Sequence, residues 1–107
     1  YNVYPAEIES TINDLPGVAE SAVIGVDDEN GLTRAKAFVV LKDKSLGSDA
    51  LSLELQTFVK AKLAPYKYPR WIEFVDELPK TATGKIQRFK LREREAGVGG
   101  GAGDGQA

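Results

Sequence analysis

The segments VAESAVIGV (residues 18–26) and AKAFVVL (residues 35–41) decide the fold, because they predict two consecutive strands. In the first segment Ala22 and Ile24 share one face of an extended chain, and Val23 lies on the other face. The residues that join the two segments begin with a polar run that is typical of a turn. The pair is therefore predicted to form an antiparallel hairpin with a connection of roughly five to eight residues.

Two helices flank this hairpin in the sequence. Apolar residues repeat at helical spacing over residues 5–14 and again over residues 51–63. Glu9 complements the positive N-terminal end of the first helix. Pro65 ends the second helix, because the residue before a proline is pushed out of the helical region.

The last third of the domain adds a short strand over residues 71–75 and a helix over residues 87–96, in which Phe89 is predicted to be the main apolar anchor. The order αββαβα predicts an α+β fold, with about three helices packed on a small antiparallel or mixed sheet of about three strands. Residues 97–107 contain six glycines in eleven positions. This tail is expected to be disordered, so that residues 1–96 form the single domain.

The composition limits the chemistry available to this domain. The 107 residues include no cysteine, histidine or methionine, which excludes disulfides, thiolate or imidazole catalysis and the usual soft-metal sites. No apolar run approaches the ~20 residues of a membrane span, and no signal-peptide pattern opens the chain, so a cytoplasmic protein is the expectation. The chain opens on Tyr1 rather than on methionine, and we expect it to be a piece of a longer polypeptide.

The charge is distributed unevenly along the chain. Residues 1–59 carry four basic and ten acidic side chains, whereas residues 60–94 carry ten basic and four acidic ones. Such asymmetry can mark an anion-binding surface, but for most of these basic residues a solvated helix face is the favoured interpretation. The basic segment contains no recognisable nucleic-acid motif, and no nucleic acid is expected as a partner.

The run LPKTATGKIQR (residues 78–88) places Lys85 at the end of a short loop that precedes the last predicted helix. Pro79 fixes the backbone that enters this loop, and Gly84 allows it to turn. A P-loop would require a glycine where Pro79 stands and a serine or threonine where Ile86 stands, so that motif is excluded. Two interpretations remain open: a surface turn with a solvated lysine, or a lysine that is brought to a nucleotide from outside.

Three motifs together resemble the C-terminal domain of the adenylate-forming enzymes: YNVYPAEIE (residues 1–9), APYKYP (residues 64–69) and PKTATGKIQR (residues 79–88). The resemblance covers roughly residues 1–96 and is strongest to the benzoate–CoA ligase group. It implies a larger preceding domain that holds the ATP and acid pockets. It also implies an acid–thiol ligase that activates an aromatic carboxylate, benzoate, as acyl-AMP and transfers it to coenzyme A. ATP and coenzyme A would be co-substrates, with Mg²⁺ expected beside ATP in the preceding domain.

The resemblance assigns the catalytic role to Lys85. A cation that bridges the acid oxygen and the α-phosphate would align the attack and stabilise the negative charge that develops. Thr81, Thr83 and Gly84 would shape the adenylate loop, and Arg88 either anchors this loop through an ion pair or contacts the ligand. Lys85 is also an expected target of a lysine acetyltransferase, because acetylation removes the charge that the reaction needs.

A second group of residues is associated with coenzyme A by the same resemblance. Tyr66 offers a ring on which adenine can stack, and Lys67 and Arg70 offer cations for phosphates. A purely structural role for the tyrosine, as a cover for the end of the preceding helix, remains equally open. The extended segment that lines the pantetheine tunnel in the family is matched here by three residues, Tyr1, Asn2 and Val3.

Other functions stay open on the sequence. Another acyl-CoA synthetase, or an adenylation domain that feeds a carrier protein, would share these motifs. A small non-catalytic binding module would lack an upstream ATP-binding domain. In either of the enzyme interpretations, the isolated chain is expected to fold and to catalyse nothing by itself.

Overall fold

The computed structural model describes residues 3–100, with side chains described as far as Gly97. Its elements follow the predicted order αββαβα, with two short 3₁₀ helices added. They are α1 (Pro5–Asn13), β1 (Val18–Asp27), β2 (Thr33–Leu41), η1 (Lys44–Leu46), α2 (Asp49–Lys62), η2 (Pro65–Lys67), β3 (Trp71–Phe74) and α3 (Arg88–Gly100). The predicted fold class is confirmed.

The three strands form one mixed sheet in the order β1-β2-β3. β1 and β2 are antiparallel, with Val23 opposite Ala37 and Asp27 opposite Thr33. β3 runs parallel to β2, with Glu73 opposite Phe38. A parallel pair requires a crossover connection, which α2 provides. β1 is thus an edge strand, with a neighbour only on the β2 side.

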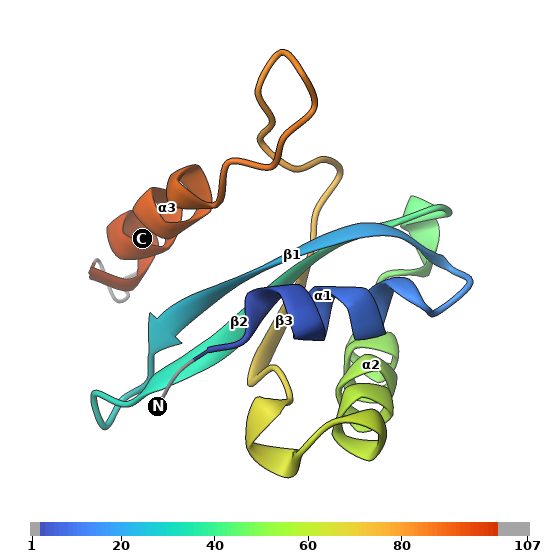
Figure 1. Ribbon diagram of the computed structural model, residues 1–107, viewed down its shortest axis with the longest axis horizontal. Coiled ribbons are helices and arrows are strands. Elements are labelled where there is room, and N and C mark those ends of the chain that lie inside the picture. Colours follow the sequence, from blue (N-terminus) through green and yellow to red (C-terminus); the bar gives the residue numbers. More distant parts are fainter. Residues whose placement is uncertain (1–2, 101–107) are drawn as a thin grey trace.

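Helices lie on both sides of the sheet (Figure 1), and an apolar core lies on each of its faces. α1 and α2 cover one face, where their apolar side chains pack against Val23 of β1. α3 covers the other face, where Leu91 belongs to the same cluster as Ile24 and Phe38. The two faces that the alternation in residues 18–26 predicts are therefore confirmed.

The last helix differs from its prediction in two respects. Its buried anchor is Leu91, which is 2% exposed, whereas Phe89 is 47% exposed. The prediction was wrong because the helix begins at Arg88 in an orientation that turns Leu91, and not Phe89, toward the sheet. α3 also continues to Gly100, past the expected end at residue 96, although each glycine costs a helix about 1 kcal/mol relative to alanine. The rest of the predicted disordered tail, residues 101–107, lies outside the described residues.

None of the helices in the described part of the chain is long and apolar enough to cross a membrane.

Candidate functional site

Residues 79–88 form a compact β-hairpin, here called the lysine hairpin, rather than an open loop. Lys80 and Ile86 form an antiparallel bridge, and the Gln87 amide donates to the Pro79 carbonyl at 2.8 Å, which closes the base. At the tip the Gly84 amide donates to the Thr81 carbonyl at 2.9 Å, and Gly84 has φ +88°. This left-handed conformation favours glycine, which explains the residue type at the turn.

The threonine hydroxyls of the lysine hairpin bond within the turn. The Oγ1 atom of Thr81 accepts a hydrogen bond from the Lys85 amide at 3.0 Å and lies 3.1 Å from the Oγ1 atom of Thr83. The Thr81 amide in turn donates to the Lys85 carbonyl at 2.8 Å. The backbone of Lys85 is therefore held from both sides, while its side chain extends from a fixed position.

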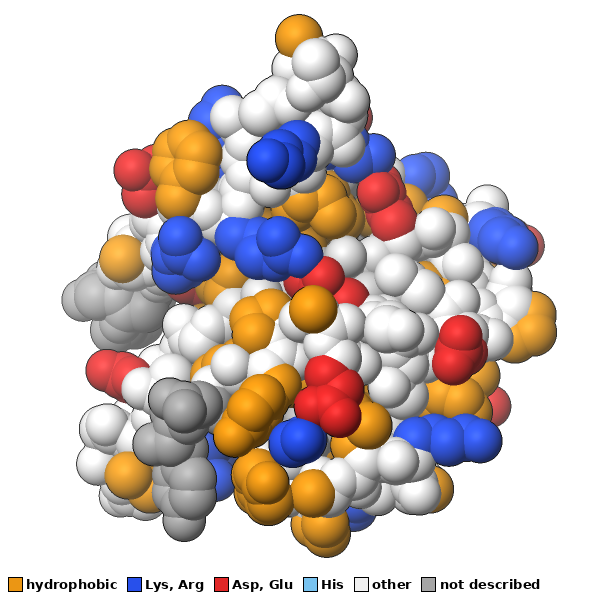
Figure 2. All heavy atoms as spheres, in the orientation of Figure 1, with side chains coloured by type: hydrophobic (Ala, Val, Ile, Leu, Met, Phe, Trp, Pro, Cys, Tyr) orange, Lys and Arg blue, Asp and Glu red, His pale blue; other side chains and the backbone are white. Residues whose placement is uncertain are grey.

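The lysine hairpin projects from the body of the domain (Figure 1), and Lys85 is exposed on it. Within residues 3–97 the Lys85 ammonium has no hydrogen-bond or ion-pair partner. Lys80, on the opposite arm, is instead paired with Glu20 at 2.9 Å. Figure 2 shows basic side chains on the projection and across the surface beneath it. The hairpin thus presents an ammonium group that is available to an anion.

Arg88 forms an ion pair inside the domain. Its Nε atom donates to Oε2 of Glu9 at 2.9 Å, and its Nη2 atom donates to Oε1 of the same carboxylate. Glu9 is 8% exposed and also accepts a hydrogen bond from the Val23 amide at 2.7 Å. Arg88 thus forms the ion pair of the first of its two predicted roles, and ligand contact by Arg88 stays a prediction. Sequence reasoning missed this role of Glu9, although its position beside the apolar face of the first helix is a signal for burial.

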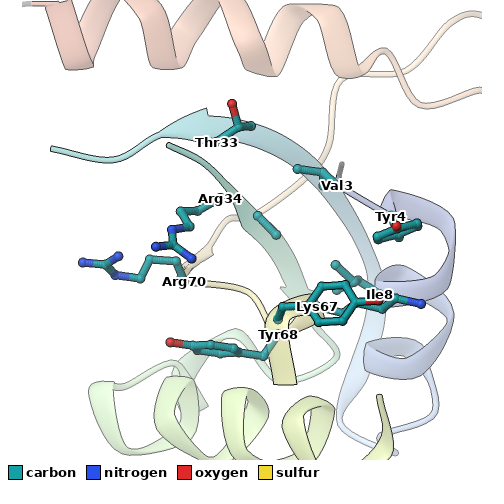
Figure 3. A pocket seen from close by; sticks show the side chains of 10 residues that line it. Val3, Tyr4, Ile8, Thr33, Arg34, Lys67, Tyr68 and Arg70 are labelled. Carbon is teal, nitrogen blue, oxygen red and sulfur yellow. The ribbon is translucent and has the colours of Figure 1, made fainter. Parts of the chain in front are cut away.

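A cavity of about 180 Å³ lies away from the lysine hairpin, between the N-terminal segment, β2 and η2. The cavity is lined by four of the residues predicted to bind coenzyme A: Val3, Tyr66, Lys67 and Arg70. Arg34, which the sequence did not single out, also lines it (Figure 3). The two remaining members of the predicted set, Tyr1 and Asn2, lie outside the described residues.

Two tyrosines and a carboxylate surround Lys67 at one end of this cavity. Its ammonium lies 2.8 Å from Glu7, 4.4 Å from the centre of the Tyr4 ring and 5.9 Å from that of Tyr66. The hydrogen bond that Lys67 donates to Glu7 holds the pKa of Lys67 above its ordinary value of 10.5, against an opposing effect of burial. The charge of Lys67 is therefore already paired, whereas the Tyr66 ring is 62% exposed and open to stacking.

Arg34 and Arg70 lie side by side at the other end of the cavity (Figure 3). Both are next to the carboxylate of Asp28. The Nε atom of Arg34 is 3.0 Å from Asp28, and the Nη1 atom of Arg70 is 3.7 Å from it. The Asp28 side chain is only 1% exposed, and it also accepts hydrogen bonds from the amides of Asn30 and Leu32. Arg70 also lies 3.4 Å from Glu29, so each of the two guanidinium groups has a carboxylate partner at this end of the cavity.

The surroundings of Asp28 predict an acid-sensitive contribution to stability. The Arg34 hydrogen bond holds the pKa of Asp28 below its ordinary value of 3.8, with further help from the two amides and against desolvation. A lowered pKa means that the carboxylate stabilises the fold above pH 3.8, and that this contribution is lost as the pH falls through the folded-state value. Asp28→Asn should therefore lower the urea midpoint at neutral pH, and its difference from the wild type should shrink in strong acid.

The exposed Asp14 provides a matched control, because its carboxylate has no hydrogen-bond or ion-pair partner among the described residues. Asp14→Asn should leave the urea midpoint at neutral pH close to that of the wild type. A deficit in Asp28→Asn that stays constant across the acid range would contradict the argument.

Within residues 3–97 no group of three or more aspartate or glutamate side chains is placed to hold a metal ion. The Mg²⁺ that the resemblance implies beside ATP remains an expectation for a preceding domain.

The fold and these two sites define a small α+β domain that presents a lysine on a projecting hairpin, apart from an aromatic and basic cavity. The sequence model of the family described as AMP-binding enzyme C-terminal domain matches residues 7–85 of the chain. The chain belongs to this family, and the resemblance inferred from the sequence is confirmed.

Known proteins of this kind are similar along most of the chain. It is 59% identical to benzoate–CoA ligase of Thauera aromatica over 90 residues, which are 84% of this chain and 17% of that protein. It is 52% identical to the human mitochondrial acyl-coenzyme A synthetase ACSM1 over 99 residues, which are 91% of this chain and 17% of that protein. The chain thus spans about a sixth of the length of these relatives.

Solved structures agree with this assignment. A benzoate CoA ligase from Burkholderia xenovorans LB400 matches with a TM-score of 0.76 and 58% identity, over 82% of this chain and 18% of that one. The anthranilate CoA ligase AuaEII in complex with anthranoyl-AMP matches with a TM-score of 0.81 and 54% identity, over 86% of this chain and 18% of that one.

Proposed function

We propose that this chain is the C-terminal domain of an AMP-forming acid–CoA ligase. In this proposal Lys85 promotes formation of the acyl-adenylate, and the cavity at Tyr66 and Arg70 binds the nucleotide end of coenzyme A. The observation that carries the proposal is the free ammonium of Lys85 on a hairpin whose other cations are paired, in a chain of this family. An unpaired, projecting cation has little use in folding and is suited to an anionic reaction centre on a neighbouring domain.

The chemistry explains why a lysine is needed. When a carboxylate attacks the α-phosphate of ATP, two anions approach each other, and the five-coordinate phosphorus that forms gains negative charge. An ammonium group placed between the acid oxygen and the phosphate reduces this repulsion and stabilises the transition state more than the ground state. The fixed backbone of Lys85 lowers the conformational cost of presenting that group.

The cavity supplies the groups that the nucleotide of coenzyme A requires. The exposed Tyr66 ring can stack on adenine, and Arg34 and Arg70 can donate to phosphate oxygens in the planar geometry that guanidinium groups favour. Lys67 pairs with Glu7 and lies against the rings of Tyr4 and Tyr66, and its role is to hold the two tyrosines.

The two sites lie at opposite ends of the β1–β2 ladder, which supports alternate use. The lysine hairpin is tied to β1 at Glu20, and the cavity begins where Thr33 faces Asp27, seven residues further along β1. This separation is roughly 24 Å along the strands. A single reaction centre on a preceding domain cannot meet both sites at once, so the domain would rotate between adenylate formation and thioester formation.

For the acid substrate we propose benzoate or a related aromatic acid, on the basis of the identity to benzoate–CoA ligase and the likeness to an anthranilate CoA ligase. Another acyl-CoA synthetase is the second candidate, because the identity to human ACSM1 is nearly as high. The acid pocket would belong to the preceding domain, in a cytoplasmic or organellar enzyme.

The proposal is tested on the full-length protein that carries this domain. ATP–pyrophosphate exchange is measured with benzoate, 3-hydroxybenzoate, 4-hydroxybutyrate and butyrate, and product formation is then measured with and without coenzyme A. Exchange that depends on an aromatic acid, followed by a thioester that requires coenzyme A, is the expected result. Absence of exchange with every acid would refute the ligase assignment, and transfer only to a carrier protein would replace coenzyme A as the acceptor.

Two substitutions in the cavity test the assignment of coenzyme A. Tyr66→Ala should raise the apparent KM for coenzyme A by about tenfold, because stacking on one base contributes roughly 1–3 kcal/mol. Arg70→Ala should have an effect of similar size, because a hydrogen bond to a charged group contributes about 1.5–3 kcal/mol. Pyrophosphate exchange should stay intact, since neither residue lies on the lysine hairpin. The control is Lys62→Ala, which removes an exposed cation of α2 that does not line the cavity. An unchanged dependence on coenzyme A would remove both residues from the site.

A further inference from the structure

We propose that Glu9 is a positioning residue for Lys85 and acts through Arg88. This inference rests on the proposed function, because it assumes that Lys85 must meet a reaction centre. It adds a residue that lies 76 positions from Lys85 in the sequence.

The Glu9 carboxylate is built into the domain as a junction. It accepts three hydrogen bonds, two from Arg88 and one from the Val23 amide. Its side chain is 10% exposed and that of Arg88 is 35% exposed, so the pair is only partly screened by water. A two-point arginine–carboxylate contact fixes orientation as well as distance, which a lysine in place of Arg88 cannot do.

The pair joins the two layers that lie on opposite faces of the sheet. Glu9 comes from α1 on one face, and Arg88 is the first residue of α3 on the other. They meet at β1, an edge strand, whose Val23 amide has Glu9 as its partner. α1 is thereby connected directly to the base of the lysine hairpin, three residues after Lys85.

A second ion pair fixes the other arm of the hairpin. Lys80 and Glu20 lie 2.9 Å apart, with side chains 38% and 29% exposed. The hairpin is thus tied to the domain on both arms, and the carboxylate at Arg88 is more buried than the one at Lys80. Since a displacement of about 1 Å can cost ~10²-fold in rate, loosening the attachment at Arg88 should reduce the step that uses Lys85.

The test uses Glu9→Gln in the full-length protein, because glutamine keeps the shape and an acceptor for the Val23 amide while it removes the charge. We expect pyrophosphate exchange to fall by about 10- to 100-fold. Conversion of supplied acyl-adenylate with coenzyme A should stay within about threefold of the wild type, because neither Glu9 nor Arg88 lines the cavity.

Arg88→Lys keeps the charge but loses the two-point contact. It should also lose pyrophosphate exchange selectively, but by a smaller factor than Glu9→Gln. It also serves as the second variant if Glu9→Gln does not fold.

The matched control is Glu95→Gln, which breaks the comparably buried Lys36–Glu95 pair at 2.7 Å further along α3. Glu95→Gln should lower thermal stability without a selective loss of pyrophosphate exchange. Amide hydrogen exchange provides a readout independent of activity: the Thr81 and Lys85 amides should exchange faster in Glu9→Gln than in Glu95→Gln.

Three outcomes would overturn the inference. The first is that pyrophosphate exchange is unchanged in Glu9→Gln and Arg88→Lys. The second is that these variants lose both half-reactions equally. The third is that Glu95→Gln shows the same selective loss. A wild-type protein without any exchange would instead refute the proposed function, and the positioning role with it, so the two failures are distinguishable.

Discussion

Replacing Lys85 by alanine should lower the rate of acyl-adenylate formation by about 10²–10³-fold, which corresponds to roughly 3–4 kcal/mol of lost transition-state stabilisation. The ammonium has no partner within residues 3–97, so its removal breaks no internal contact and should leave the fold intact. The thioester-forming step should be largely spared, because the proposed coenzyme A cavity lies elsewhere. Pyrophosphate exchange and conversion of supplied acyl-adenylate, measured on the full-length protein, separate the two steps.

Lys90→Ala is the matched control for this substitution, since Lys90 is an exposed lysine in the first turn of α3. It should leave both half-reactions close to wild type. Lys85→Arg should recover little activity, because a planar guanidinium is a poor substitute for a compact charge that must fit between two oxygens. An equal loss of both half-reactions in Lys85→Ala would refute the catalytic assignment.

Replacing Phe38 by alanine should destabilise the domain by about 3–5 kcal/mol, the range for a buried phenylalanine. Phe38 is completely buried in the core between the sheet and α3, and the cations of Lys36 and Arg94 lie 5.0 Å and 5.5 Å from its ring centre. Its removal leaves a cavity and takes away the surface on which these cations rest. For a domain of this size the Tm should fall by more than about 12 °C, measured by circular dichroism.

Phe89→Ala removes the same atoms from an exposed position of α3 and is the control. It should change stability by no more than about 0.5 kcal/mol, as exposed substitutions usually do. Equal effects of the two substitutions would mean that Leu91 and Phe38 do not form the contact between α3 and the sheet.

Much of the fold was predictable because its signals are local. The alternation around Val23 predicts both faces of β1, and the prolines at 5 and 65 mark element ends that the structure reproduces. Whether β3 pairs parallel or antiparallel was not predictable, since that depends on the path of α2 across the sheet. The wrong prediction of Phe89 as the anchor of α3, in place of Leu91, has a similar cause. The sequence of a weakly apolar helix does not by itself define which of its faces packs against the core.

The candidate site was predictable only where its residues are close in sequence. The lysine hairpin and the cluster at Tyr66 follow from short motifs, and the structure brings Val3 beside that cluster. Arg34 joins the cavity from β2, and Glu9 meets Arg88 across 79 residues. Contacts between distant segments arise from the topology of the sheet, so the periodicity of one segment cannot predict them.

The side-chain contacts along the outer edge of β1 affect how the domain behaves at high concentration. An uncovered edge strand is a template for pairing with other chains, and such pairing leads to aggregates. Here the Glu9 carboxylate occupies the Val23 amide, and Asn13 accepts a hydrogen bond from the Ser21 hydroxyl at 2.9 Å. The opposite edge is β3, which is only four residues long. Because a side chain occupies a backbone donor in the middle of one edge and the other edge is short, both edges are less suited to intermolecular sheet growth at high concentration.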